Sequence, residues 1–110
     1  MDITISEMKR VTLIEISGRI DSTNATKLGE ALNEQIDAGR HQLVADLARV
    51  DYMSSAGLRE LVSAVKKLRK LNGDLRVASP SPRVKEVLDL AGLDSIFQMF
   101  TTPVEAVGSF

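Results

Sequence analysis

Polar and apolar residues alternate in two stretches at the start of the chain, a period typical of half-buried β-strands. The first stretch runs from Ile3 to Glu7 and the second from Val11 to Ser17, and both are rich in β-branched residues. Only residues 8–10 separate them, so the pattern predicts a β-hairpin. Gly18 follows the second stretch and is expected to end its strand.

A helical period takes over after residue 21, with apolar residues three or four positions apart. The first helix has Ser22, Thr23 and Asn24 as candidate N-caps, and Gly39 is expected to end it. The second helix presents one apolar face, formed by Leu58, Leu61, Val62, Val65 and Leu68.

Short apolar runs predict further strands at 43–47, 74–78 and 96–100, and residues 48–54 are expected to form a turn. A third helix is expected between the Pro-Ser-Pro turn and Gly92, and a final helical turn at 103–107. The resulting order predicts an α/β fold: a mixed sheet of about five strands, with an opening hairpin and then alternating strands and helices, covered by three to four helices. At 110 residues, the chain is expected to form a single domain, 1–110.

Composition narrows the classes of function. The net charge is −1, which gives no general attraction for nucleic acid or anionic membranes. The chain has no Cys and a single His, His41, and it shows no EF-hand spacing, so we expect neither a metal nor a cofactor. It begins without a signal-peptide pattern and has no apolar run of membrane-spanning length, so we expect a cytoplasmic protein. Its balanced charge favours a monomer.

Two serines, Ser54 and Ser55, stand where a loop becomes the first turn of an amphipathic helix. The backbone there presents unpaired N–H groups and the positive end of the helix dipole. Either serine can cap the helix, and ordinary capping without further function is one interpretation. The other is phosphorylation, because the same N–H groups would accept a phosphate without unfolding the helix. Gly57 is expected to leave room for a partner's active site.

The sequence gives little support for an enzymatic function. A nucleophilic serine needs a base and a group that orients the base, but His41 lies in a different loop and has no identifiable acidic partner. No Walker loop is present, since Gly18 and Gly57 are isolated glycines in unrelated turns. We therefore expect a binding protein, not an enzyme.

The segment from Val44 to Leu58, with Asp46-Leu followed by Ser-Ser-Ala-Gly-Leu, resembles the signature of STAS domains, the family of bacterial anti-sigma factor antagonists. The family pattern is a strand ending in Asp-Leu, a short loop, and Asp-Ser-Ser/Thr-Gly-Leu opening a helix. Two further segments match in order. Residues 18–21, Gly-Arg-Ile-Asp, resemble the family's Gly-Glu-Leu-Asp, and residues 79–93 resemble the passage from the fourth strand through the third helix. The resemblance covers almost the whole chain and implies the STAS fold.

The resemblance also implies a mechanism, partner switching. The unphosphorylated antagonist binds an anti-sigma factor that is itself a GHKL-type serine kinase, and so releases the sigma factor. Phosphorylation of the antagonist ends the binding, and a PP2C-type serine phosphatase restores it. ATP would then be the substrate of the kinase and not a cofactor of this chain. The alternative reading is a STAS subunit of a lipid-transporting ABC permease complex.

In the family pattern the phosphorylated position falls on Ser55, with Ser54 as the second choice. Ser54 takes the place of the family's Asp, and Ala56 that of its Ser or Thr. The expected partner-binding residues are Asp21, Ser54, Ser55, Ala56, Gly57 and Arg59. A phosphate on Ser55 is expected to be repelled by nearby carboxylates, for which Asp21, Asp46 and Asp51 are the candidates.

Overall fold

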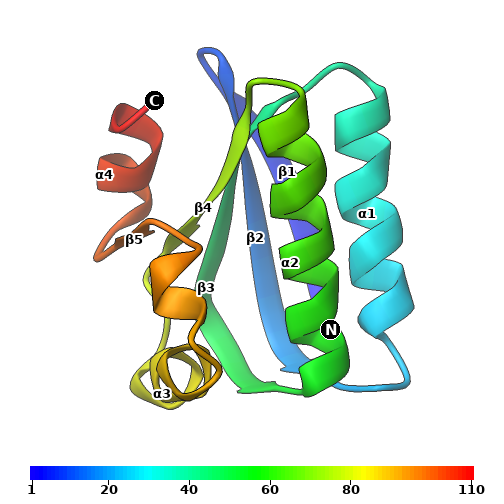
Figure 1. The fold of residues 1–110 in the computed structure, drawn as a ribbon, viewed down its shortest axis with the longest axis vertical. Helices are drawn as coiled ribbons and strands as arrows, with labels where there is room; N and C mark the ends of the chain where they lie inside the picture. Colours follow the sequence, from blue (N-terminus) through cyan, green and yellow to red (C-terminus); the bar gives the residue numbers. More distant parts are fainter.

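Five strands form one mixed sheet in the order β1-β2-β3-β4-β5 in the computed structural model, which describes residues 1–110 (Figure 1). β1 (Asp2–Met8) and β2 (Val11–Ile20) form the antiparallel hairpin that the alternating pattern predicts. β3 (Gln42–Met53), β4 (Asp74–Ala78) and β5 (Met99–Phe100) each pair in parallel with the preceding strand. The expected α/β architecture is confirmed.

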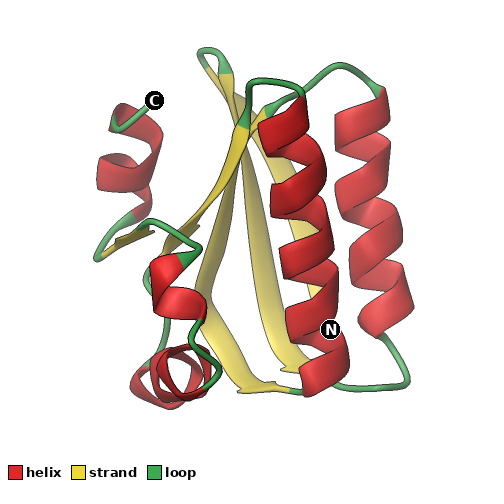
Figure 2. Cartoon of the chain, viewed as in Figure 1, coloured by secondary structure: helices red, strands yellow, loops and turns green.

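Two long helices, α1 (Ala25–Asp37) and α2 (Ser55–Lys70), lie side by side on one face of the sheet (Figures 1 and 2). α3 (Pro82–Leu90) and the 3-10 turn η1 (Leu93–Ser95) lie by the β3–β4 side, where α3 contacts β3. The short α4 (Pro103–Gly108) packs on β3, β4 and β5. No helix is long and apolar enough to cross a membrane.

The core is aliphatic, as the scarcity of aromatic residues requires. Successive side chains of a strand point to opposite faces of the sheet, so β2 contributes to two clusters. Ile14 and Ile16 belong to the main cluster under α1 and α2, whereas Val11 and Leu13 belong to a smaller cluster that Ala106 of α4 completes. The main cluster has 21 buried residues, and apolar side chains of both long helices belong to it, so it fixes these helices to the sheet.

Three boundaries differ from those expected. Gly18 does not end β2, because the strand continues to Ile20 through shifts in register around Gly18, whose φ of 92° is accessible mainly to glycine. Residues 48–53 form no turn and instead extend β3 to Met53. The last strand is only Met99–Phe100. Phe97 is instead buried in the core after η1, with its N–H bonded to the Leu93 carbonyl.

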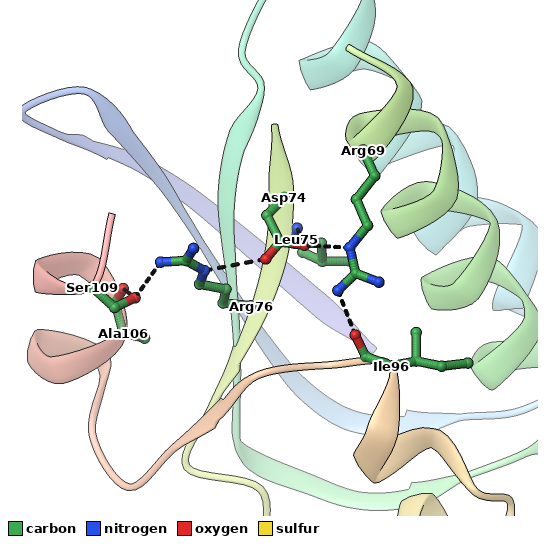
Figure 3. A network of polar contacts seen from close by, with 7 residues as sticks. All are labelled: Arg69, Asp74, Leu75, Arg76, Ile96, Ala106 and Ser109. Carbon is green, nitrogen blue, oxygen red and sulfur yellow. Dashed lines mark hydrogen bonds and ion pairs between the residues drawn. The ribbon is translucent and has the colours of Figure 1, made fainter. Parts of the chain in front are cut away.

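The far end of α2 is tied to the rest of the molecule by a polar network around Asp74, a residue only 8% exposed at the start of β4 (Figure 3). Its carboxylate accepts hydrogen bonds from Arg69 Nε of α2 at 3.1 Å and from Arg76 Nε of β4 at 3.2 Å. Arg69 also donates to the carbonyl of Ile96, and Arg76 Nη1 donates to Ser109 Oγ at 2.8 Å. One carboxylate therefore joins α2, β4 and the C-terminal segment.

Replacing this carboxylate should weaken the fold. We expect Asp74→Ala to lower the free energy of unfolding by about 2–3 kcal/mol, because two guanidinium groups and the Leu75 N–H lose their acceptor. Urea denaturation measures the change. Glu30→Ala, an exposed carboxylate on α1, is the control and should change stability by less than about 0.5 kcal/mol. Equal effects of the two substitutions would contradict a structural role for the network.

Candidate functional site

The site forms where β2 and β3 end side by side. Arg19 pairs with Tyr52 and Ile20 with Met53 in the parallel register, and the Ser54 N–H donates to the Ile20 carbonyl at 2.8 Å. The residue after each strand is therefore placed next to the other: Asp21 after β2 and Ser54 after β3. The structure thus brings together the Asp21 loop and the serine pair, as the sequence analysis expected.

The two serines have different environments. Ser54 is the N-cap of α2, and its Oγ accepts a hydrogen bond from the Gly57 N–H at 3.2 Å. Ser55 is the first residue of the helix, is exposed, and its hydroxyl makes no hydrogen bond within the chain. Capping is thus the role of Ser54, and the Ser55 hydroxyl stays exposed and without a hydrogen bond in the chain.

The start of α2 offers backbone donors beside that hydroxyl. The N–H groups of Ser55 and Ala56 have no helical carbonyl four residues back, and the helix dipole adds partial positive charge at the same point. Arg59 lies one turn further along the helix on the face of Ser55 and is exposed. An anion on Ser55 would therefore find local stabilisation without a change in the helix.

Gly57 lies in the interior and not at the surface where a partner would approach. It is buried and faces the interior, where an added Cβ would lie 2.6 Å from Ile20 Cγ2 and 3.0 Å from Met53 Sδ. The absence of a side chain therefore lets α2 start against the ends of β2 and β3, and it does not clear a path for a partner. The expectation that Gly57 leaves room for a partner's active site is wrong.

The Asp21 loop is held by its own hydrogen bonds. Asp21 Oδ1 accepts from the Thr23 N–H at 2.9 Å and from Thr23 Oγ1 at 2.5 Å. Asn24, the N-cap of α1, makes no side-chain cap; its Oδ1 accepts from the Asp21 N–H and its amide nitrogen donates to the Arg19 carbonyl. The hydrogen bonds from Thr23, with a smaller contribution from Arg19, hold the pKa of the Asp21 carboxyl below its usual value.

Two residues at the site were not anticipated. The guanidinium carbon of Arg19 lies 4.2 Å from the centre of the Tyr52 ring, and Arg19 Nε lies 4.0 Å from Asp21 Oδ2. Of the two residues that end β3, Met53 is buried, whereas Tyr52 is 36% exposed. These two residues could have been found from the pairing of Arg19 with Tyr52 in the sheet. That pairing can be predicted only if residues 48–53 are known to form a strand.

One expected neighbour of the phosphate position is not there. Asp46 lies in the middle of β3, and roughly 25 Å of extended chain separates it from Ser54. Its Oδ1 accepts instead from the Ala48 N–H at 3.0 Å. Asp51, exposed near the end of β3, and Asp21 remain the carboxylates close in sequence or register to Ser55.

No group of three or more His, Asp or Glu side chains in the structure could hold a metal ion. His41 is at the opposite end of β3 from the serines, where its carbonyl accepts from the Asp74 N–H. This arrangement gives neither serine a histidine base. The site consists of two strand ends, a helix start and an exposed hydroxyl, with charged side chains around it.

Comparison with known proteins decides the family. The model of the STAS domain matches residues 2–106 of the chain. This protein belongs to the STAS domain family. BtrV of Bordetella bronchiseptica, named a candidate anti-sigma factor antagonist, is 34% identical over 110 residues, which are all of this STAS domain and 95% of BtrV. RsfB of Mycobacterium tuberculosis, an anti-sigma-F factor antagonist, is 29% identical over 105 residues, covering 96% of this chain and 85% of RsfB.

Solved structures share the fold. The anti-sigma factor antagonist SpoIIAA in its unphosphorylated form superposes with a TM-score of 0.84 at 21% identity, over 96% of this STAS domain and 93% of SpoIIAA. Bacillus SpoIIAA in its phosphorylated form gives a TM-score of 0.78 at 20% identity, over 98% of both chains. At these identities the likeness concerns the fold.

The buried position of Gly57 leads to a stability prediction. Ala favours helix more than Gly, yet Gly57→Ala should lower the free energy of unfolding by about 1–2 kcal/mol, because the new methyl group meets a buried branched side chain. Gly108→Ala is the matched control, since nothing lies within 4 Å of its added Cβ and the helical backbone permits Ala. Thermal or urea unfolding should show destabilisation for Gly57→Ala only; the opposite order would contradict this packing.

The Asp21 loop leads to a titration prediction. The pKa of the Asp21 carboxyl is lowered in the folded chain. The contribution of ionised Asp21 to the free energy of unfolding is therefore fully present above pH 3.8, its usual pKa, and is lost as the pH falls through the lower pKa of the folded chain. Carboxyl-carbon NMR of the folded chain should give a midpoint below 3.8. Thr23→Ala removes the hydroxyl donor and should move the midpoint up towards 3.8, whereas Ser22→Ala should leave it in place. An unchanged midpoint in Thr23→Ala would exclude this cause.

Proposed function

We propose that this STAS domain is an anti-sigma factor antagonist that acts by partner switching, with Ser55 as the phosphorylated residue. In its unphosphorylated form it binds an anti-sigma factor and so releases the sigma factor. The observation that carries the proposal is the exposed Ser55 hydroxyl, free of hydrogen bonds at the start of α2, beside an Asp21 loop of fixed geometry. The names of the relatives BtrV and RsfB agree with it.

Charge explains how a single phosphate acts as the switch. A phosphoserine carries about −1.5 to −2 charges at neutral pH. The helix start tolerates that charge in the isolated chain, where water screens it. In an interface the phosphate would lose its hydration, and water would screen its repulsion by Asp21 and Asp51 of the same chain less. A loss of about 3–4 kcal/mol of binding free energy corresponds to a few hundred-fold in affinity, enough to release the partner.

Ser54, which stands where the family pattern has Asp, is compatible with this proposal. Both Ser and Asp are good N-caps, and Ser54 does cap α2. The helix start, and with it the position of Ser55, is therefore kept without the carboxylate. Ser54 is the weaker acceptor candidate because its oxygen is engaged with the Gly57 N–H.

The proposal defines the partners. The anti-sigma factor is a GHKL-type serine kinase that supplies the phosphate from ATP, and a PP2C-type serine phosphatase removes it. The STAS domain itself contributes a binding surface and an acceptor hydroxyl, works as a monomer in the cytoplasm with the sigma factor, and catalyses no step. The partner-binding surface consists of Asp21, Ser54, Ser55, Ala56 and Arg59, with Gly57 acting indirectly from beneath.

A pull-down of the tagged chain from its native cell, followed by mass spectrometry of partners and of residues 50–59, tests the function. We expect a serine-kinase anti-sigma factor in the bound pool and a phosphate on Ser55 in the unbound pool. Calorimetry with the purified kinase should show at least about 100-fold weaker binding for the phosphorylated chain. Ser55→Ala should bind and remain unphosphorylated.

Ser54→Ala serves as the control in the same experiment. It should lose about 1 kcal/mol of stability through the missing cap and still be phosphorylated on Ser55. Recovery of permease and ATPase subunits with Ser55 unmodified would overturn the proposal and identify a subunit of a lipid-transporting ABC permease complex instead.

A further inference from the structure

Arg19 holds a prominent position at the site for which capping and phosphorylation give no explanation. Arg19 pairs with Tyr52, and the next pair, Ile20 with Met53, is the last of the two strands. Asp21 follows β2 and Ser54 follows β3. The Arg19 side chain is 61% exposed and Tyr52 is 36% exposed. Both side chains are therefore accessible at the end of the sheet where the chain continues into Asp21 and Ser54.

The structure restrains the Arg19 guanidinium without satisfying it. The group lies over the Tyr52 ring at 4.2 Å, and its contact with Asp21 is a single one at 4.0 Å. It makes no hydrogen bond within the chain, while the neighbouring Asp21 Oδ1 is already occupied by two hydrogen bonds from Thr23. Stacking on an aromatic face leaves the edge of a guanidinium, with its N–H groups, available for a planar acceptor.

Such a pre-oriented fork matches one chemical group best. Carboxylates accept two parallel N–H bonds from a guanidinium, and a side chain already held in place loses less conformational entropy on binding. A partner with a cation opposite Arg19 would be repelled and one with a carboxylate attracted, so the charge of this residue can discriminate between partners.

We propose that Arg19, stacked on Tyr52, is a specificity-determining contact that pairs with a carboxylate of the anti-sigma factor. The inference rests on the proposed function and deepens it, since it states the chemistry of the partner at the strand ends from which Asp21 and Ser54 follow. Asp21 then has a second role: it biases the orientation of the guanidinium across the strand end.

Calorimetry with the purified anti-sigma factor recovered in the pull-down tests this contact. Arg19→Glu should weaken binding about 100-fold, and Arg19→Lys about fivefold, because Lys keeps the charge but loses the fork and the stacking. Tyr52→Phe should bind within about twofold of the unaltered chain, because the ring is kept, and Tyr52→Ala about fivefold more weakly.

Arg10→Glu is the matched control. Arg10 is exposed, forms no ion pair and lies in the hairpin turn at the opposite end of β2, so the substitution makes the same change in net charge away from the site. It should leave the affinity within about twofold. Equal weakening by Arg10→Glu and Arg19→Glu would mean that only net charge acts, and would overturn the proposal.

The outcomes separate this inference from the proposed function. If phosphorylation of Ser55 abolishes binding while Arg19→Glu binds normally, partner switching stands and the Arg19 contact fails. If the unaltered chain binds no anti-sigma factor, the proposed function is wrong, and the Arg19 contact that rests on it is wrong as well. In a scan of Asp→Arg and Glu→Arg variants of the anti-sigma factor, one should restore binding of Arg19→Glu; restoration by none would overturn the acidic counterpart.

Discussion

The parallel pairing between the ends of β2 and β3 is the constraint on which the site depends. The last bond of this pairing, from the Ser54 N–H to the Ile20 carbonyl, fixes the residue at which α2 starts. Gly57 allows that start to lie directly against Ile20 and Met53, both of which are buried. The contacts of Gly57 with Ile20 and Met53 are therefore part of the core, and they also fix the position of Ser55 at the surface.

This arrangement explains how an exposed hydroxyl on a small domain can be positioned accurately. The Ser55 hydroxyl makes no hydrogen bond within the chain, but Ser54 caps the helix, and the apolar face of α2 begins at Leu58, three residues after Ser55. At the other end of α2, Arg69 joins the buried Asp74 (Figure 3). The helix is thus fixed at both ends, and a modification at its first residue has a rigid body to act on.

Most of the fold could be predicted because alternating and helical periods differ clearly in this chain, and because Gly39 and Gly92 do adopt the positive φ that ends a helix. The extension of β3 could not. Its residues from Ala48 to Tyr52 are mostly exposed, so they carry neither an apolar run nor a regular alternation, and they resemble a turn. They remain extended because β2 keeps pairing with them through two register shifts, at each of which β3 has one extra residue. This is a long-range interaction without a local sequence signal.

The candidate site shows the same division. The serine pair and Asp21 are candidates from the sequence and the resemblance alone, whereas the placement of Gly57 and Arg19 depends on which way each residue faces at the strand ends. Gly57 faces inward and Arg19 outward, although both lie within a few residues of the motif. A phosphate on Ser55 would lie above the packed residues around Gly57, which resist rearrangement. The added charge would therefore change the electrostatics of the surface and not the fold. For such a domain, control of binding by electrostatics requires no second conformation.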